Sequence, residues 1–542
     1  MDKDKRLIVN ISKQGNIIDL NFRALLAILL IMAVSLLSSS VQAYDAPPKD
    51  QGHSGPECKN PDSDPDDNPC QQGVADPVTI KDGNFRITET DFVIPGVGFS
   101  LGIHRSFNNQ HNLKEGPFGF GWTFNYAVSL LEINDGVNNQ VIIKRGDGVE
   151  FLFQANSDGS YTSPHGRFLS LTKSAGIFSL TAKNGNVQRF DSSGRRISIA
   201  DSNNNQMTFS YDSAGRLTTV IDATARTMTL QYNSKNKISK VIDPANRTFL
   251  YAYDENNNLI SFTDPNTHKT EYIYDDIHRM TAKKNAKGVE IVRNTYGAQN
   301  KVTQQFLKGG TFNFTYYDGY TRVCNRRNYC TNYYYNETGN PTRIHKPVVG
   351  SSYRTYDDDL NLVQYKEENN SVWNYTYDNN GNLLTVTDPN NHTITYTYEP
   401  NFNKVASNTD AKQNTTQFEY DAKGNLTKIT NALNQVVLKV NSYDTQGNPL
   451  EIEEGNGVKS QLSYDLNGQL VGTTIDGSLT NFSYDNIGNV TKMTLPDGQI
   501  IDYQYDAAGR LTEINDADGN KFKFILDAVG NILSQEIVDI LE

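Results

Sequence analysis

The chain has 542 residues and a formal net charge of -12, and its charges form no basic stripe of the kind that nucleic-acid-binding proteins carry. Aromatic residues make up 10% of the chain, which excludes an intrinsically disordered polymer. The chain contains 30 Tyr, 24 Phe and 40 Gly. Tyr and Phe favour strands and Gly favours turns, so the composition predicts an all-β fold of many short strands joined by tight turns.

The first 43 residues are predicted to be a secretory signal peptide. Basic residues precede an apolar run over 24–37, which is shorter than the roughly 20 residues that a membrane-spanning helix needs. The run is followed by Val41-Gln42-Ala43, which has the small-residue form of a signal-peptidase site. We therefore expect an exported protein of the periplasm, cell surface or extracellular space, with no membrane span after cleavage. An uncleaved anchor is the alternative interpretation of the same run.

Residues 44–77 are predicted to form an acidic, Pro-rich linker. This linker contains Cys58 and Cys70, and the other two cysteines are Cys324 and Cys330. Because disulfides are the default in an exported protein, we expect two disulfides between near neighbours in the sequence. A zinc site is the alternative, but the two pairs are far apart and neither has C-x₂-C spacing. Cys324 and Cys330 flank five residues of a predicted hairpin tip, where cross-strand cysteines lie close enough to bond.

A short signature recurs from residue 190 onward. About 17 units of about 21 residues follow one another, and most begin with Tyr-Asp and carry Gly or Asn at the fifth position. The residues that we expect to be structural in four clear copies are Tyr211, Asp212, Gly215, Tyr377, Asp378, Gly381, Tyr420, Asp421, Gly424, Tyr505, Asp506 and Gly509. Each unit is therefore predicted to have the same local fold.

One unit, residues 377–398, shows why this fold is a β-hairpin. Asp378 favours the first position of a turn through its side chain, and Gly381 supplies the left-handed conformation that closes it. Asp388-Pro389 opens a second turn. The strands between these turns cannot be stable as one isolated hairpin, so stacked units must share a continuous buried face.

The return strand of each unit has alternating character. Ile394, Tyr396 and Tyr398 alternate with threonines, which predicts one aromatic face and one Thr/Gln face. In the first strand of the unit, Leu383 and Val386 lie three residues apart, which breaks the alternation and is consistent with a β-bulge.

The Tyr-Asp-x-x-Gly-(Asn/Arg)-Leu repeat over 190–542 resembles the YD repeat of Rhs proteins, teneurins and the C subunits of insecticidal toxin complexes. Segments before the repeats are similar to the opening of bacterial Rhs proteins, and they are Asn68-Pro69, 79–84, Glu89-Thr90-Asp91-Phe92, 105–109, 116–122 and 147–151. The resemblance implies an N-terminal β-rich domain over 78–189 and a β-strip spirally wound into a hollow shell. In many family members this shell encloses a toxin that forms the C-terminus of the chain.

The sequence departs from the family pattern in lacking the Asp-Pro-x-Gly-Leu core motif and a variable toxin domain. About 34 strands at about 4.8 Å each give a strip of roughly 160 Å, against about 125 Å around a cargo of about 100 residues. We expect little more than one turn, a partial shell that cannot enclose a toxin alone and whose last strand is an exposed edge. A truncated product, half of a split shell and a short member with another role remain open.

The function expected from the resemblance is a secreted or cell-envelope Rhs/YD-repeat scaffold, part of or truncated from a toxin-encapsulating polymorphic-toxin shell. No catalysis of its own, no cofactor and no nucleic-acid partner are expected. The expected partner is a second Rhs chain or a C-terminal toxin fragment that completes the shell. The alternative is a cell-surface protein that binds carbohydrate or mediates adhesion, with glycans as ligands.

Other chemistry-bearing patterns are interpreted as structural. Ser100 lies in a G-x-S-x-G match, but a strand pattern follows where a nucleophile elbow needs a helix. The acidic run Asp62, Asp64, Asp66 and Asp67 could attract Ca²⁺, but prolines interrupt it and a solvated linker is favoured, so no metal site is predicted. His268 and His392 occupy equivalent positions at second turns, and the Arg-Gly-Asp at 145–147 coincides with a turn of the family pattern.

Overall fold

The computed structural model describes residues 73–75, 78–134, 139–307, 310–516 and 518–538. This part of the chain is built of strands β1–β47, together with two short 3₁₀ helices, η1 (Asn109–His111) and η2 (Ala298–Asn300). Within it, no helix is long and apolar enough to cross a bilayer. The expected all-β fold is confirmed.

Four small sheets precede the repeats. β3 (Arg86–Ile94), β4 (Leu101–Asn108) and β7 (Trp122–Phe124) form a three-stranded sheet. The other three sheets contain β1 (Gly73–Ala75) with β2 (Val78–Thr79); β5 (Glu115–Gly116) with β6 (Gly119–Phe120); and β8 (Ser129–Asn134) with β9 (Asn139–Lys144), β10 (Glu150–Ala155) and β11 (Tyr161–Thr162). We call residues 78–126 the leading segment.

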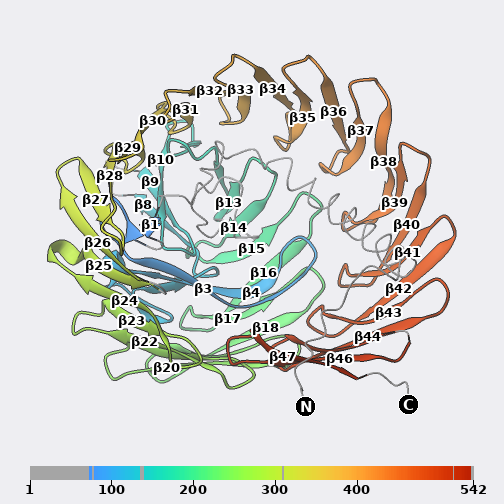
Figure 1. Cartoon of the computed structure of the whole chain (residues 1–542), viewed down its shortest axis with the longest axis horizontal. Helices are drawn as coiled ribbons and strands as arrows, with labels where there is room; N and C mark the ends of the chain where they lie inside the picture. Colours follow the sequence, from blue (N-terminus) through green and yellow to red (C-terminus); the bar gives the residue numbers. More distant parts are fainter. Residues whose placement is uncertain (1–72, 76–77, 135–138, 308–309, 517, 539–542) are drawn as a thin grey trace, which may run out of the picture. The chain divides into compact units, whose positions relative to one another are not determined.

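The repeats form one sheet of 36 strands, β12 to β47, in which every strand pairs with its neighbours in sequence order (Figure 1). The strands are β12 (Ser170–Ser174), β13 (Ile177–Thr181), β14 (Val187–Phe190), β15 (Arg196–Ala200), β16 (Gln206–Tyr211), β17 (Leu217–Ile221), β18 (Thr227–Tyr232), β19 (Ile238–Ile242), β20 (Thr248–Tyr253), β21 (Leu259–Thr263), β22 (Lys269–Tyr274), β23 (Met280–Lys284), β24 (Glu290–Tyr296), β25 (Val302–Leu307), β26 (Gly310–Tyr317), β27 (Tyr320–Cys324), β28 (Cys330–Tyr335), β29 (Pro341–Lys346), β30 (Gly350–Tyr356), β31 (Leu362–Lys366), β32 (Val372–Tyr377), β33 (Leu383–Thr387), β34 (Thr393–Tyr398), β35 (Val405–Thr409), β36 (Thr415–Tyr420), β37 (Leu426–Thr430), β38 (Val436–Tyr443), β39 (Pro449–Glu454), β40 (Lys459–Tyr464), β41 (Leu470–Ile475), β42 (Ser478–Tyr484), β43 (Val490–Thr494), β44 (Ile500–Tyr505), β45 (Leu511–Asn515), β46 (Lys521–Leu526) and β47 (Ile532–Val538). We call this sheet the strip. It begins at Ser170, upstream of the first repeat signature.

The hairpin predicted for residues 377–398 is present as β33 and β34, and its bulge is confirmed. Tyr377 pairs with Leu383 while Thr376 pairs with Thr385, so Leu384 is the extra residue. The same shift recurs before the tyrosine of other units, for example between Ser210 and Tyr211. The bulge therefore resets the alternation in the repeats that contain it and lets the leucine face the core; the unit at Tyr317 is an exception without a shift.

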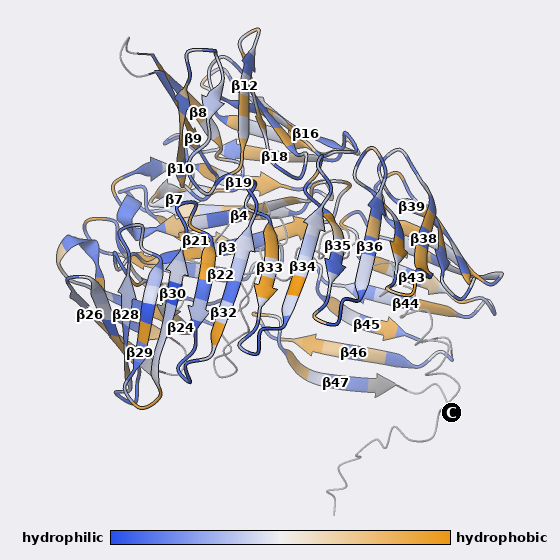
Figure 2. Cartoon of the chain, turned by 90° about the horizontal axis from the view of Figure 1, so that it is seen from above, coloured by the Kyte–Doolittle hydropathy of each residue, from blue (hydrophilic) through white to orange (hydrophobic). Residues whose placement is uncertain are grey.

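The alternation of apolar and polar residues appears along the strands in Figure 2. Met228 and Leu230 on β18 are 0% and 2% exposed, while Thr227 and Gln231 on the same strand are exposed. The predicted aromatic face is thus the core face of the strip. We call the opposite, polar side the outer face.

The strip returns on itself, so that turns of distant hairpins meet. The side-chain amides of Asn203 and Asn425 donate to each other's oxygens at 3.0 Å, and Lys287 forms an ion pair with Asp527. Asn203 follows β15 and Asn425 follows β36, which are 21 strands apart, and Lys287 and Asp527 follow β23 and β46, which are 23 strands apart. A strip of 36 strands therefore makes about one and a half turns. The expectation of little more than one turn was too low, because each turn needs fewer strands than the cargo estimate assumed.

Candidate functional site

The Asp of each repeat organises the turn that follows it. The Oδ1 atom of Asp378 accepts hydrogen bonds from the backbone N–H groups of Asn380 and Asn382 at 2.9 and 2.8 Å. Its Oδ2 atom accepts from the side chain of Asn382 at 2.9 Å, and Gly381 has a φ of 68°. The sixth position of the signature therefore closes the turn, a role that sequence reasoning missed although it noted the Asn/Arg preference.

Arginine can take the place of that asparagine and adds a second contact. Arg216 Nε donates to Asp212 Oδ2 at 2.8 Å, and its guanidinium lies 4.8 Å from the ring centre of Tyr232 in the next unit. The hydrogen bonds from Arg216 lower the pKa of Asp212. The arginine thus links one turn to the tyrosine of the following repeat by a cation–π contact.

The repeat tyrosine joins each unit to the one before it. The hydroxyl groups of Tyr211 and Tyr420 donate to the carbonyls of Arg196 and Val405, each at 2.8 Å and each 15 residues earlier. Tyr377 and Tyr505 make the same bond with Leu362 and Val490. The buried hydroxyl therefore satisfies a backbone carbonyl next to the bulge, where the ladder is interrupted.

A buried ion pair within the leading segment is hydrogen-bonded to two tyrosines of the strip. Arg105 Nε and Nη2 donate to the two carboxylate oxygens of Asp91, each at 2.7 Å, and these side chains are 0% and 1% exposed. Asp91 also accepts from the hydroxyl of Tyr251 at 2.6 Å, and Arg105 donates to Tyr272 at 3.2 Å. Both tyrosines belong to the strip, and Tyr251 follows Asp91 by 160 residues in the sequence. The motif residues of the leading segment therefore contact a part of the chain that is far away in sequence.

Aromatic rings enclose the Arg105 guanidinium. Its carbon lies 4.9 Å from the ring centre of Trp122 and 5.2 Å from that of Phe262, with Phe118, Tyr251 and Tyr272 within 5.7 Å. A charge removed from water in this way needs its partner, because a buried carboxylate or guanidinium alone is strongly unfavourable. The cluster therefore specifies one position for the leading segment on the strip.

The leading segment covers the core face over only part of the strip. Beneath it, Phe249 and Tyr251 on β20 are 2% and 4% exposed, and Figure 1 shows β3 and β4 on the inner side of the curved strip. On β44 the equivalent residues Ile501 and Tyr503 are only half-buried, as is Phe522 on β46. The same apolar face thus continues onto strands where no described residue covers it fully.

This uncovered face forms two patches, each of which extends across neighbouring strands. Tyr503 pairs with Ile514, which in turn pairs with Phe522, and on earlier strands of the strip Ile394 pairs with Val386. All five side chains are half-buried. We call the core-face residues of β33–β36 and β43–β46 the open core face, and it is the candidate functional site.

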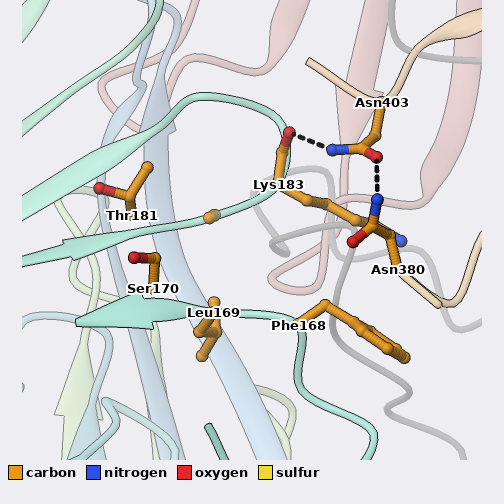
Figure 3. Close-up of a pocket in the computed structure, with 8 residues that line it drawn as sticks. Phe168, Leu169, Ser170, Thr181, Lys183, Asn380 and Asn403 are labelled. Carbon is orange, nitrogen blue, oxygen red and sulfur yellow. Dashed lines mark hydrogen bonds between the residues drawn. The ribbon is translucent and has the colours of Figure 1, made fainter. Parts of the chain in front are cut away.

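A pocket of about 350 Å³ lies where the first turn of the strip meets the second (Figure 3). It is lined by Phe168, Thr181 and Lys183 near the start of the strip and by Asn380 and Asn403 from later turns. Asn403 donates to the carbonyl of Lys183 at 3.0 Å. The lining offers amide and hydroxyl groups and the ammonium of Lys183, without any carboxylate, imidazole or thiol, and its contacts hold the two turns together.

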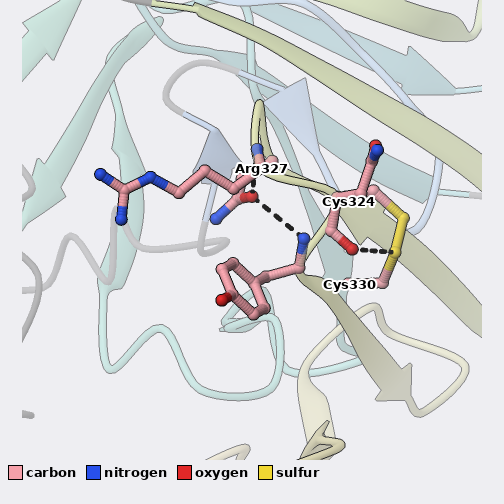
Figure 4. Close-up of a disulfide and its surroundings, with 6 residues drawn as sticks. Cys324, Arg327 and Cys330 are labelled. Atoms are coloured by element: carbon pink, nitrogen blue, oxygen red, sulfur yellow. Dashed lines mark hydrogen bonds between the residues drawn. A yellow bond between two sulfur atoms is a disulfide. The ribbon is translucent and has the colours of Figure 1, made fainter.

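Cys324 and Cys330 form the predicted disulfide at the base of the hairpin tip between β27 and β28 (Figure 4). They are directly opposite each other in the strand register. Cys58 and Cys70 lie outside the described residues, as do the acidic run over 62–67 and the predicted signal peptide.

The remaining sequence candidates lie in structural positions. Ser100 immediately precedes β4, so a strand follows it as expected. His268 and His392 each contact the Asp four residues earlier, with Nδ1 at 3.3 and 2.9 Å from the carboxylate. Among the described residues, His, Cys, Asp and Glu side chains form no group of three or more that could hold a metal ion.

Family comparisons match this architecture. A model described as "RHS Repeat" matches residues 190–227, 253–290, 356–393, 377–407, 402–436 and 484–521. The chain belongs to the RHS-repeat family. A second model, described as "Domain of unknown function (DUF6531)", matches residues 75–153 of this RHS-repeat chain, which include the leading segment.

Curated relatives of the RHS-repeat chain include the "tRNA nuclease WapA" of Bacillus subtilis (strain 168) and the "tRNA3(Ser)-specific nuclease WapA" of Bacillus spizizenii. Each is 28% identical over 130 residues, which are 24% of this chain and 5% of the relative. The chain thus matches a small part of much longer proteins.

Among solved structures, the crystal structure of TcdB2-TccC3-Cdc42 is similar with a TM-score of 0.50 and 14% identity. The similarity covers 84% of this chain and 26% of that one. The structure of the Photorhabdus luminescens Tc holotoxin pore is matched with a TM-score of 0.49 and 14% identity, over 82% of this chain and 26% of that one. At this identity the first likeness shows a shared fold.

Proposed function

We propose that this RHS-repeat chain is an exported scaffold that forms part of a container wall and holds a polypeptide cargo, such as a toxin segment, against its open core face. The proposal includes no catalysis by the chain itself. The observation that supports it is the continuation of the core face beyond the leading segment. Where the leading segment covers this face, Phe249 is 2% exposed, and where it does not, the equivalent Ile501 is half-buried.

The chemistry of the open core face favours a polypeptide that exposes apolar side chains. Large contiguous apolar surfaces on a protein usually mark an interaction site. Here the surface combines aliphatic and aromatic side chains, and the hydroxyls of the repeat tyrosines Tyr398, Tyr420 and Tyr505 are already bonded to backbone carbonyls. A cargo would therefore be held by apolar contact without sequence-specific hydrogen bonds, which suits a container that accepts different contents.

Binding of a reduced and alkylated, permanently unfolded polypeptide to the full chain tests this function. We expect Tyr503→Glu, which places a charge on the open core face, to abolish binding, because burial of an unpaired charge is strongly unfavourable. Gln504→Glu is the matched control, since Gln504 is the next residue on the same strand and faces outward. Equal loss in both variants, or no binding by the native chain, would refute the proposal.

A glycan array with the same preparations addresses the carbohydrate-binding alternative. Specific glycan binding together with no uptake of the unfolded polypeptide would favour adhesion over containment. Sequencing and co-expression of the neighbouring reading frames provide a second test. A co-purifying polypeptide that becomes protease-sensitive in Tyr503→Glu is the expected result for a cargo.

A further inference from the structure

A row of aromatic and cationic side chains crosses the outer face of the strip. Tyr317, Tyr320, Tyr334, Arg343 and Tyr353 lie on five consecutive strands, β26–β30, and each is directly opposite the next in the register. The ring centres of Tyr317 and Tyr320 are 4.5 Å apart, and those of Tyr320 and Tyr334 are 4.9 Å apart. The Arg343 guanidinium continues the row, at 5.0 Å from Tyr334 and 5.6 Å from Tyr353.

The row is on the outer face because its neighbours in sequence point to the core. Val323 and Ile344 are 4% and 8% exposed, whereas Tyr317 and Tyr353 at the two ends of the row are 43% and 42% exposed. Arg322, which follows the row on β27, is also exposed. We call Tyr317, Tyr320, Arg322, Tyr334, Arg343 and Tyr353 the outer patch.

The outer patch is cationic on an acidic protein. The outward positions of β26–β31 that are in register with it include no Asp or Glu, and Lys366, opposite Tyr353, adds a further positive charge. Elsewhere on the outer face several lysines are paired with carboxylates, as in Lys428 with Glu419 at 2.5 Å and Lys523 with Glu513 at 3.9 Å. The net charge of the chain is -12, so the uncompensated arginines of the outer patch are a local reversal of charge.

This stretch also departs from the repeat pattern. The six segments matched by the RHS repeat model leave residues 291–355 unmatched, and the patch residues all fall in this gap. Tyrosine and arginine are the residues most enriched at the energetic centres of protein interfaces. The patch spans five strands, and the four spacings between them add up to about 19 Å, which matches an extended peptide of about six residues and is smaller than a standard protein–protein interface.

We propose that the outer patch binds an extended acidic segment of a separate partner protein. Carboxylates of the segment would pair with Arg322 and Arg343, for which a bidentate guanidinium is well suited. The tyrosine hydroxyls would donate further hydrogen bonds to the same carboxylates. This surface lies on the side of the sheet opposite the open core face, so occupation of one does not require occupation of the other.

Fluorescence anisotropy with the full chain and a labelled peptide of about six residues, alternating Glu and Ser, tests the proposal. We expect binding that weakens as salt is raised, because solvent-exposed charge pairs are screened. Arg322→Ser and Arg343→Ser should each weaken binding about tenfold, the effect of losing one hydrogen bond to a charged group. Arg322 makes none of the row's ring contacts, so its variant tests binding even if Arg343→Ser alters the row.

The control variant Lys428→Ser/Lys523→Ser removes two outer-face cations that are paired with Glu419 and Glu513, and we expect it to bind the peptide normally. Equal weakening in this control, or no binding by the native chain, would overturn the proposal. So would tighter binding of dextran sulfate that depends on the same arginines, because the site would then serve a polyanionic glycan.

The acidic run of the chain itself is an alternative occupant of the outer patch, and it must be distinguished from a partner protein. Neutralising Asp62, Asp64, Asp66 and Asp67 to Asn should leave the affinity for the peptide unchanged. A clear rise in affinity would show that this run competes for the outer patch and would overturn the assignment to a separate partner.

Discussion

Replacing the repeat tyrosine with phenylalanine isolates the hydroxyl that joins neighbouring repeats. In Tyr420→Phe the hydrogen bond to the carbonyl of Val405, 2.8 Å long, is lost while the ring stays in place. A net contribution of about 1 kcal/mol is expected for such a bond, rising toward about 2 kcal/mol because the carbonyl is left without its donor. Tyr464 is a natural control, since its buried hydroxyl has no hydrogen-bond partner among the described residues.

Because repeat arrays can open segment by segment, the assay should be local. Native-state hydrogen exchange of the amides of β35 and β36 should accelerate about fivefold or more in Tyr420→Phe, which corresponds to about 1 kcal/mol. Tyr464→Phe should leave the exchange of β39 and β40 unchanged or slower. Equal acceleration in both variants would refute the reasoning, because it would show that the hydroxyl bond to the previous repeat is not what stabilises the strip.

Further predictions concern the contact between turns, the disulfide and pH. Gly381→Ala should destabilise the protein by about 1–3 kcal/mol more than Gly215→Ala. Both glycines have positive φ, but an added Cβ at Gly381 would lie 2.1 Å from Phe168, whereas nothing lies within 4 Å of one at Gly215. Equal urea midpoints of the two variants would contradict this prediction. Mass spectrometry of non-reduced peptides should link Cys324 to Cys330, and free thiols there in exported protein would count against the assignment. Hydrogen bonds lower the pKa of Asp212 and Asp410, so their stabilisation is complete above the unfolded pKa of about 4 and is lost as pH falls below it. Burial raises the pKa of Tyr484 to about 12, so its stabilisation is complete below about pH 10 and is lost as pH rises from about 10 to about 12. Circular dichroism across the acidic and the alkaline range checks the direction of both effects, and a flat profile would contradict them.

Local features of the strip could be predicted from the sequence because the interactions that define them are local. The turn at Asp378, the left-handed Gly381 and the bulge implied by Leu383 and Val386 all lie within one repeat. The disulfide joins residues that flank one hairpin tip. Repetition strengthened these inferences, since the same pattern had to satisfy the same backbone groups many times.

Contacts between distant segments could not be predicted in the same way. Asp91 and Arg105 belong to motifs that the sequence identified, but nothing local indicates that Tyr251 completes their cluster. The meeting of Asn203 and Asn425 depends on the curvature of the sheet, which sums small twists over many strands. The open core face was likewise hidden, because its residues follow the same alternation as those beneath the leading segment.

The contacts between successive turns of the strip constrain how such a protein can change in length. Asn203 and Asn425 meet only because a fixed number of hairpins separates them. One hairpin inserted between Lys287 and Asn425 would shift both this contact and the ion pair of Lys287 with Asp527 by two strands. Added hairpins beyond the last of these contacts would disturb none of them. The strip therefore tolerates hairpins that are added at its end, and it resists the insertion of hairpins between residues that meet across successive turns.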